Sequence, residues 1–174
     1  MTLIILMSIF SIQSWICDFG NGTDGTQWQI VNDGVMGGVS TSSAYITDTS
    51  MIFFGNLSLE NNGGFASVRS PYQRYDFTEN KTIEIRYRSK GGTFMFRFEQ
   101  SRYFYNPYYA IELDESEEWT TLKMSLEDVD VFRMGSKTGS TLGEKDLKAL
   151  RLGLMKADKK PGAFEIEIDF IKIY

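Results

Sequence analysis

Side chains with reactive chemistry are few in this chain. The sequence has no histidine and a single cysteine, Cys17. It therefore lacks the usual general base near neutral pH, a Ser-His-Asp triad, an internal disulfide and a Cys-cluster zinc site. Carboxylates such as Asp33, Glu99 and Glu112 are present, but a glycosidase needs two of them at a fixed separation, and surface solvation explains them more simply. We therefore expect no enzyme, no cofactor and no dedicated metal site.

A glycine-rich segment from Trp28 to Ser40 is the most distinctive stretch. It holds two turn signals, Asp33-Gly34 and Gly37-Gly38, around the apolar pair Val35-Met36. Such turns bend the chain sharply, and glycine density often marks a close backbone approach. Two interpretations stay open: a binding turn, or a purely structural β-bend with Met36 and Trp28 in the core.

Two further features are candidates for binding. Arg69 lies in the alternating segment Phe65–Ser70, where an arginine is either paired with a carboxylate or holds a polar ligand. The segment Ser101–Tyr109 is rich in tyrosine, which is typical of protein interfaces and also suits stacking on sugars. The alternative is that these rings fold back onto the core. The tyrosines are Tyr103, Tyr105, Tyr108 and Tyr109.

The composition bounds the class of protein. The 174 residues fit one domain, 42% are hydrophobic and 14% aromatic, so the chain is not disordered and leans towards β-structure. The formal net charge of −5 argues against nucleic-acid binding and gives no reason to expect binding to anionic membranes.

The N-terminal residues 1–14 are almost entirely apolar. The run from Leu3 to Ile12 is too short for a transmembrane helix, so we expect no integral membrane span. Residues 1–14 resemble the apolar region of a signal peptide, although a positive start is missing; the alternative is an N-terminal core strand. Export, for example to a periplasm, is slightly favoured over a cytoplasmic location. Residues 15–174 then form a single β-sandwich domain.

Short alternating segments predict the strands that position these residues. We expect a first strand at Trp15–Phe19, a hairpin of Ser43–Thr47 with Met51–Phe54, and a second hairpin of Thr82–Arg88 with Thr93–Glu99. Gly135–Thr141 is expected to be a loop, and Gly143–Leu150 a short helix.

Strands follow at Tyr109–Leu113, Trp119–Leu126 and Arg151–Met155. The last segment, Phe164–Tyr174, changes its apolar phase at Phe170-Ile171, which indicates a β-bulge. The composition of the loop Gly20–Thr26 predicts a solvated turn. The alternative is a bound calcium ion, with Asn21 or Asp24 of this loop, or Asp169 elsewhere in the chain, as oxygen ligands.

Many short strands and glycine-rich turns predict an all-β fold: an antiparallel β-sandwich of jelly-roll type with one short helix. The first and last strands are expected to lie side by side and close the domain.

Several motifs in order resemble the complex I intermediate-associated protein 30 family. They are Trp28 with Asn-Asp-Gly-Val-Met-Gly-Gly-Val-Ser at 32–40, Gly-Asn-Leu-Ser at 55–58, Asn-Asn-Gly-Gly-Phe-Ala-Ser-Val-Arg-Ser at 61–70, Trp119, Leu-Gly-Leu at 152–154, and Gly-Ala-Phe-Glu-Ile-Glu-Ile-Asp-Phe-Ile at 162–171. The resemblance covers about residues 16–174. It implies a galactose-binding-like jelly roll, similar to some carbohydrate-binding modules, and a chaperone role in assembling respiratory NADH:ubiquinone oxidoreductase, with no catalytic residues to carry over.

We therefore expect a non-catalytic domain that binds a protein partner, such as subunits of the respiratory complex. The alternative is a carbohydrate-binding module of an exported protein, with a glycan as partner. The candidate binding surface consists of Trp28, Asp33, Met36, Gly37, Gly38, Ser40, Arg69, Tyr103, Tyr105, Tyr108 and Tyr109.

Overall fold

The computed structural model describes residues 14–145 and 147–174. The expectation of a signal peptide or core strand in residues 1–14 lies almost wholly outside them. The described residues form strands and short 3-10 turns, with no α-helix. The strands are β1 (Trp15–Asp18), β2 (Gln29–Asn32), β3 (Thr41–Ile46), β4 (Met51–Leu57), β5 (Ala66–Arg69), β6 (Tyr75–Asp76), β7 (Thr82–Lys90), β8 (Phe94–Glu99), β9 (Tyr108–Leu113), β10 (Thr120–Ser125), β11 (Asp130–Arg133), β12 (Ser136–Thr141), β13 (Lys148–Ala149), β14 (Arg151–Lys156) and β15 (Gly162–Ile173). The 3-10 turns are η1 (Phe19–Asn21), η2 (Asp33–Met36), η3 (Glu60–Asn62) and η4 (Leu126–Asp128).

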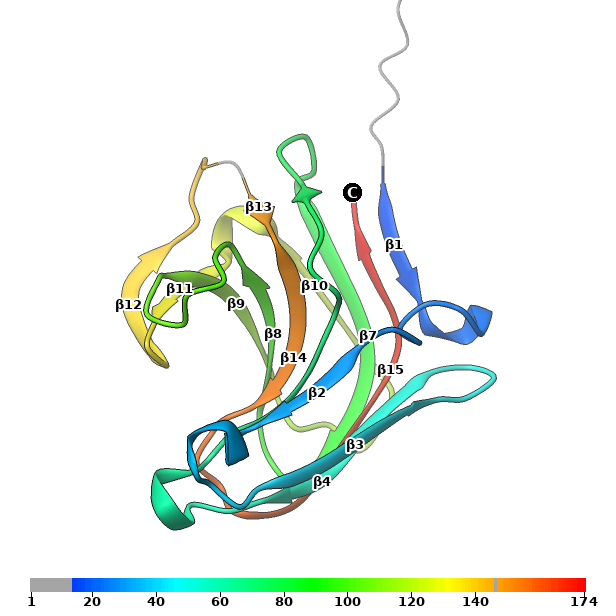
Figure 1. Cartoon of the computed structure of the whole chain (residues 1–174). Coiled ribbons are helices and arrows are strands. Elements are labelled where there is room, and N and C mark those ends of the chain that lie inside the picture. Colours follow the sequence, from blue (N-terminus) through cyan, green and yellow to red (C-terminus); the bar gives the residue numbers. More distant parts are fainter. Residues whose placement is uncertain (1–13, 146) are drawn as a thin grey trace, which may run out of the picture.

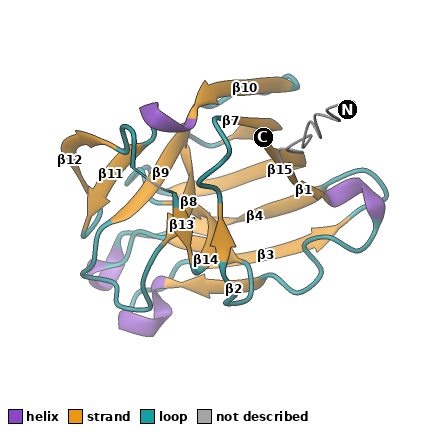
Figure 2. Cartoon of the chain, turned by 90° about the horizontal axis from the view of Figure 1, so that it is seen from above, coloured by secondary structure: helices purple, strands orange, loops and turns teal. Residues whose placement is uncertain are grey.

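Two antiparallel sheets form the sandwich (Figure 1, Figure 2). The first, sheet A, has the order β10-β7-β15-β4-β3, with β1 added beside β15. The second, sheet B, has the order β12-β11-β9-β8-β14-β5-β2. A separate pair, β13 with β6, lies at the periphery. The predicted all-β jelly-roll sandwich is confirmed.

The core lies between the two sheets because each sheet turns one apolar face inward. Phe94, Phe96 and Phe98 of β8 are fully buried, and so are Ile83 and Ile85 of β7 on the facing sheet. Successive strand residues point to opposite faces, so the alternation seen in the sequence places one face of each strand in this core. The other face of each strand is left for surface chemistry.

The two ends of the described chain meet in sheet A. β1 pairs antiparallel with β15, with Cys17 opposite Ile171, and Figure 1 shows β1 beside the C-terminal end. The register of β15 against β7 shifts between Ile168 and Phe170. Both the side-by-side pairing and the bulge are therefore confirmed. The hairpin of β3 and β4 is confirmed as well.

The predicted hairpin of Thr82–Arg88 with Thr93–Glu99 is wrong. β7 pairs with β10 and β15 in sheet A, whereas β8 pairs with β9 and β14 in sheet B. The Gly91-Gly92 turn, with φ of 91° and 113°, carries the chain from one sheet to the other. A tight glycine turn between two alternating strands is compatible with either arrangement, and both apolar faces point into the same core.

The predicted helix at Gly143–Leu150 is also wrong. Leu142 and Leu147 are buried, but their backbone groups bond to other segments: Leu142 N donates to Val129 O at 2.7 Å, and Phe77 N donates to Leu147 O at 2.9 Å. Tertiary partners therefore hold the segment in a turn followed by β13. The predicted loop at Gly135–Thr141 instead contains β12, an exposed edge strand paired with β11.

In residues 14–145 and 147–174 there is no helix with the length and apolar character that a membrane crossing requires. Within the same ranges no group of three or more His, Cys, Asp or Glu side chains is arranged to hold a metal ion. Asn21 and Asp24 instead serve the loop itself, because Asn21 Oδ1 accepts from Thr23 N and Asp24 Oδ2 accepts from Asp18 N, both at 2.9 Å.

Candidate functional site

The outer face of sheet B carries a cluster of charged side chains. Because Phe94, Phe96 and Phe98 point inward, Arg97 and Glu99 point outward from β8. Arg151 of β14 lies opposite Glu99. Arg69 is the last residue of β5, one strand farther on. We call Arg69, Arg97, Glu99 and Arg151 the arginine cluster.

One carboxylate serves three guanidinium groups in this cluster. Arg151 donates from Nη2 and Nε to Glu99 Oε2, at 2.5 Å and 2.8 Å. Arg69 Nη1 and Arg97 Nη2 lie 3.6 Å and 3.8 Å from Glu99 Oε1. The side chains are 8–15% exposed, so the cluster is largely shielded from water but still reaches the surface. It carries two positive charges in excess in a chain of net charge −5.

Aromatic rings lie against the guanidinium groups. Arg97 Cζ is 3.7 Å from the centre of the Tyr108 ring, and Arg151 Cζ is 4.4 Å from the centre of Tyr72. Arg102 also contacts Tyr72, at 4.7 Å. These are cation–π contacts, which partly offset the removal of the arginines from water.

Burial and the charges of neighbouring arginines lower the pKa values of Arg69 and Arg97. Burial lowers the pKa of Arg69 to about 10; Glu99 opposes this effect, and the charges of Arg151 and Arg97 add to it. Burial likewise lowers the pKa of Arg97, against the raising effects of Tyr108 and Glu99. A further negative charge at this place would stabilise the charged forms.

The aromatic loop beside this cluster is exposed. Arg102 connects the two, and the next three residues, Tyr103, Phe104 and Tyr105, are 63%, 76% and 48% exposed. The rings of Tyr103 and Tyr105 stack on each other, with centroids 5.5 Å apart. Tyr108, by contrast, is buried and stacks on Phe132. Tyr108 belongs to a small separate cluster with Ala110 and Phe132, whereas Tyr109 packs against the main core. The interpretation that the rings fold back onto the core therefore holds for Tyr109 but not for the loop tip.

Asp33, a predicted surface residue, is fully buried. Its carboxylate accepts hydrogen bonds from Ser40 N at 3.0 Å, Ser40 Oγ at 2.5 Å, Gly64 N at 2.6 Å and Phe65 N at 3.2 Å. Ser40 is buried too. The acceptors of Asp33 are thus used inside the fold, and the side chain presents no surface to a partner.

Glycines of two motifs, Gly38 and Gly63, leave room for this carboxylate. A Cβ at Gly38 would lie 2.4 Å from Asp33 Cγ, and one at Gly63 would lie 2.6 Å from Asp33 Oδ2. Gly37 ends η2 in the left-handed region with φ of 90°. Close backbone approach to a buried side chain therefore explains Gly38 and Gly63, and the left-handed backbone explains Gly37.

The remaining predicted residues are dispersed. Trp28 is half-buried, edge-on to Phe19 at 5.6 Å, so the core interpretation holds for it. Met36 is 65% exposed, and with Val35 at 72% it forms the tip of η2 rather than core. Tyr109 packs against the core. The candidate surface is therefore not one surface.

The turn η2 and the aromatic loop lie at opposite ends of sheet B. η2 follows Asn32, which pairs with Ala66, which in turn pairs with Lys156. The aromatic loop follows Glu99, which pairs with Arg151 at the other end of β14. Of the predicted residues, Arg69 lies in the arginine cluster and Tyr108 contacts it through Arg97. Tyr103 and Tyr105 are linked to the cluster only through the neighbouring Arg102, which shares Tyr72 with Arg151, and the η2 residues lie apart.

Arg97, Arg151 and Tyr72 are not among the site residues that the sequence pattern predicts, and Glu99 is suggested there only as a glycosidase carboxylate. A signal was present for two of them. Arg97 and Glu99 alternate with three phenylalanines on β8, so they must share the outer face. That Arg151 and Arg69 lie beside them depends on the order of the strands.

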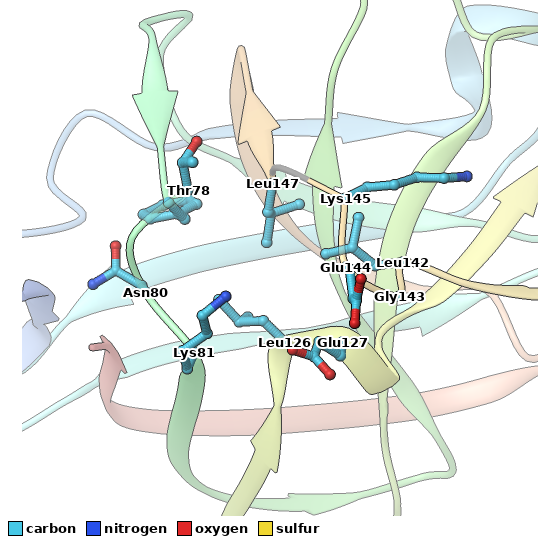
Figure 3. A pocket seen from close by; sticks show the side chains of 11 residues that line it. Thr78, Asn80, Lys81, Leu126, Glu127, Leu142, Gly143, Glu144, Lys145 and Leu147 are labelled. Atoms are coloured by element: carbon cyan, nitrogen blue, oxygen red, sulfur yellow. The ribbon is translucent and has the colours of Figure 1, made fainter.

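Two hollows in the described surface lie elsewhere. One has a volume of ≈ 30 Å³, about that of one water molecule, and lies among Lys81, Leu126 and Gly143 (Figure 3). Backbone hydrogen bonds such as Leu126 N to Lys81 O at 2.9 Å join the segments around it. The other, of ≈ 260 Å³, is lined by Trp28, Ala44, Tyr45 and other mostly apolar residues at the sandwich edge. Neither is lined by the arginine cluster.

Several solved structures share the fold of this chain. A family 11 carbohydrate-binding module from Clostridium thermocellum, in complex with a β-1,3-1,4-mixed-linked tetrasaccharide, superposes with a TM-score of 0.67 at 15% identity, over 94% of this chain and 96% of that one. A family 29 carbohydrate-binding module gives 0.56 at 9% identity, over 92% and 90%. A protein described as a native glycosidic hydrolase gives 0.55 at 14% identity, over 96% and 98%. The chain has the β-sandwich, jelly-roll fold of these proteins, and these likenesses concern the fold alone.

The family follows from the sequence. The complex I intermediate-associated protein 30 family matches residues 17–168, so the chain belongs to that family. The search of curated proteins finds no match. The resemblance predicted from the motifs is confirmed.

Proposed function

We propose that this chain is a non-catalytic docking domain that binds a protein partner during assembly of a larger complex, with subunits of respiratory complex I as the partners. The observation that supports it is the arginine cluster lying beside the exposed loop Tyr103–Tyr105 on the outer face of sheet B. Family membership supports the assembly role.

The residue types at this surface suit protein recognition. Tyr and Arg are enriched among residues that dominate binding energy, and exposed aromatic rings lose little conformational entropy on binding. Phe104 is 76% exposed, which leaves a large apolar ring in water. A partner that covers the loop would remove this apolar surface from water while the arginines supply orientation.

Native electrophoresis of complex I subassemblies tests the assembly role. In cells of the natural host, we expect the chain to co-migrate with partly assembled complex I, and its deletion to make such subassemblies accumulate. The double change Tyr103→Ser and Phe104→Ser should abolish co-migration without altering the melting temperature. Val35→Ser, at the equally exposed tip of η2, is the matched control and should have no effect.

Two kinds of result would change or contradict this proposal. Loss of co-migration in Val35→Ser but not in the loop variant would place the docking surface on η2. A chain that never migrates with a subassembly, or a mature form cleaved near residue 14 and exported, would contradict the assembly role.

A second candidate function is glycan binding. The observation that favours it is the exposed, stacked pair Tyr103 and Tyr105, since sugar rings pack on tyrosine faces. Affinity electrophoresis in gels that contain mixed-linked β-glucan tests it. Retardation that Tyr103→Ala and Tyr105→Ala remove would favour this function, and unretarded migration would count against it.

A further inference from the structure

We infer that the arginine cluster is a binding site for a carboxylate, and that its ligand is an acidic side chain on a peptide segment of a protein partner. This inference rests on the proposed docking function and specifies the chemistry of the partner. It follows from the arrangement of three strands, the charge of the cluster and one unpartnered nitrogen atom.

Gly153 leaves a gap between two of the arginines. In the register of sheet B, Arg69 lies opposite Gly153, and Gly153 lies opposite Arg97. Directly opposed residues of antiparallel strands project to the same face. The two arginines therefore flank a position that carries no side chain.

Gly153 is itself buried, and the Arg69 side chain lies beside the place that a Cβ would occupy. A Cβ at Gly153 would meet Arg69 Cγ at 3.4 Å and Val68 O at 3.6 Å, which are ordinary contacts. Neighbouring strands are about 4.8 Å apart, so the Cα atoms of Arg69 and Arg97 are about 10 Å apart across Gly153. In the proposed complex the carboxylate lies between these two guanidinium groups, above Gly153.

The charges of the cluster are unbalanced. The carboxylate of Glu99 has two oxygens for three guanidinium groups. Arg151 Nη2 donates to one of these oxygens, Oε2, at 2.5 Å. Arg69 and Arg97 share the other at 3.6 Å and 3.8 Å, which is too long for strong hydrogen bonds. Arg69 Nε already donates to Ser67 Oγ at 2.8 Å, so a second carboxylate would supply a closer acceptor for Arg69 Nη1 and Arg97 Nη2.

Arg97 has an unused donor. Its Nε is buried and has no hydrogen-bond acceptor, the one buried side-chain nitrogen or oxygen of this kind in the part of the chain that the structure describes. Its Nη1 faces the weak acceptor Met155 Sδ at 3.1 Å. An unpaired buried donor is costly, so an anion beside Arg97 would gain a charge-assisted hydrogen bond.

The aromatic surroundings favour a peptide over an acidic sugar. Tyr108 is buried beneath Arg97, and the ring of Tyr72, although 41% exposed, contacts both Arg151 and Arg102. A sugar that stacks on Tyr72 would compete with these two guanidinium groups for the ring. A Glu or Asp side chain needs only the guanidinium forks, and its peptide would run onto the exposed Tyr103–Tyr105 loop.

Titration of the purified chain with an oligoglutamate peptide tests the inference. We expect saturable binding that weakens as salt is added, and a shift of the Arg97 Nε–Hε signal in the nuclear magnetic resonance spectrum. Gly153→Leu fills the gap and should weaken binding at least about tenfold. Arg69→Gln should weaken it as well.

Three controls are matched to these variants. Gly153→Ala adds a group that fits the gap and should leave binding nearly unchanged. Arg88→Gln removes an arginine from the opposite sheet, where Arg88 pairs with Glu167, and should also have no effect. A glycine–serine peptide of equal length should not bind. The melting temperature of each variant reports whether it is folded.

Each contrary outcome overturns the inference in its own way. Binding of oligogalacturonate but not of oligoglutamate would assign the site to an acidic glycan. Binding of inorganic phosphate alone, or peptide binding unaffected by Gly153→Leu in a folded protein, would remove the proposed carboxylate site. If the peptide fails while the chain still co-migrates with its assembly partner through the loop, this inference fails and the proposed function stands.

Discussion

The hydroxyl of Ser40 donates a 2.5 Å hydrogen bond to the carboxylate of Asp33 inside the protein, across seven residues of chain. The same carboxylate accepts from Gly64 N and Phe65 N. It therefore joins the two glycine-rich motifs that carry the family resemblance. Those motifs form one structural unit, and this unit holds β2 against β5.

Asp33→Ala should destabilise the protein strongly. The change leaves several buried donors without an acceptor, which costs at least about 3 kcal/mol. For a chain of this size the melting temperature should fall by about 6–12 °C. Thermal unfolding followed by circular dichroism measures this, with Asp48→Ala in the β3–β4 turn as a control. An unchanged melting temperature would show that the carboxylate is not structural.

The stability that Asp33 contributes should depend on pH. Burial acts to raise the pKa of the Asp33 carboxyl, but the hydrogen bonds from Ser40, Gly64 and Phe65 hold it below its usual value. A lowered folded-state pKa stabilises the protein above the unfolded value of about 4 and is lost as the pH falls through the folded value. The difference in unfolding free energy between the natural chain and Asp33→Asn should therefore be constant near neutral pH and shrink in acid. A difference that grows in acid would contradict this.

The glycines around Asp33 should differ in how much stability is lost when each is replaced by alanine. Gly38→Ala places a methyl group 2.4 Å from Asp33 Cγ, so about 1–3 kcal/mol should be lost. Gly37→Ala should lose about 1 kcal/mol because its φ is 90°. Gly34→Ala is the matched control, since its Cβ would meet nothing within 4 Å. Urea unfolding of the three variants should rank them in that order, and equal losses would argue against the buried carboxylate as the cause.

Glu99→Gln should destabilise the arginine cluster. The variant keeps the shape of the side chain but leaves three largely buried arginines without a counter-charge, which costs about 3 kcal/mol or more. Glu165→Gln is the control, because its pair with Lys90 is exposed and should contribute little. Chemical denaturation measures both variants. Equal stability would mean that the cluster is well solvated.

Cys17 should be unreactive in the folded protein. Burial, together with the nearby charges of Asp24 and Asp18, raises the pKa of its thiol to about 12. The thiolate is the reactive form, so iodoacetamide at mildly alkaline pH should modify the chain only after unfolding. Rapid modification without denaturant would show that β1 detaches from β15.

Local patterns in the sequence predicted most strands. The alternation of Phe94, Phe96 and Phe98 with polar residues indicates a half-buried strand whatever it pairs with. It does not say which sheet contains that strand, and so the hairpin of β7 with β8 was wrong. The spacing of Leu142, Leu147 and Leu150 suits a short helix equally well as a turn anchored at both ends, and tertiary hydrogen bonds selected the turn.

The site illustrates the same limit. Arg69 could be selected from its strand, and the tyrosines from their density. For Asp33, however, the sequence predicts a surface turn residue, because turns containing Asp-Gly are usually solvated. It is buried only because the distant residues Gly64 and Phe65 pack against its carboxylate in the folded chain. Arg151 has no local signal that separates it from other strand arginines.

The sequence by itself determined the β class, the family, the strand faces and the absence of histidine chemistry, because these depend on residue type and on the two-residue period of a strand. The tertiary structure alone decided that β5, β14 and β8 are neighbours, and therefore that Arg69 and Arg97 flank Gly153 with Glu99 and Arg151 beside them. Strand order is set by packing of the whole core between two sheets, and residues 69, 97 and 151 meet only when that core is complete.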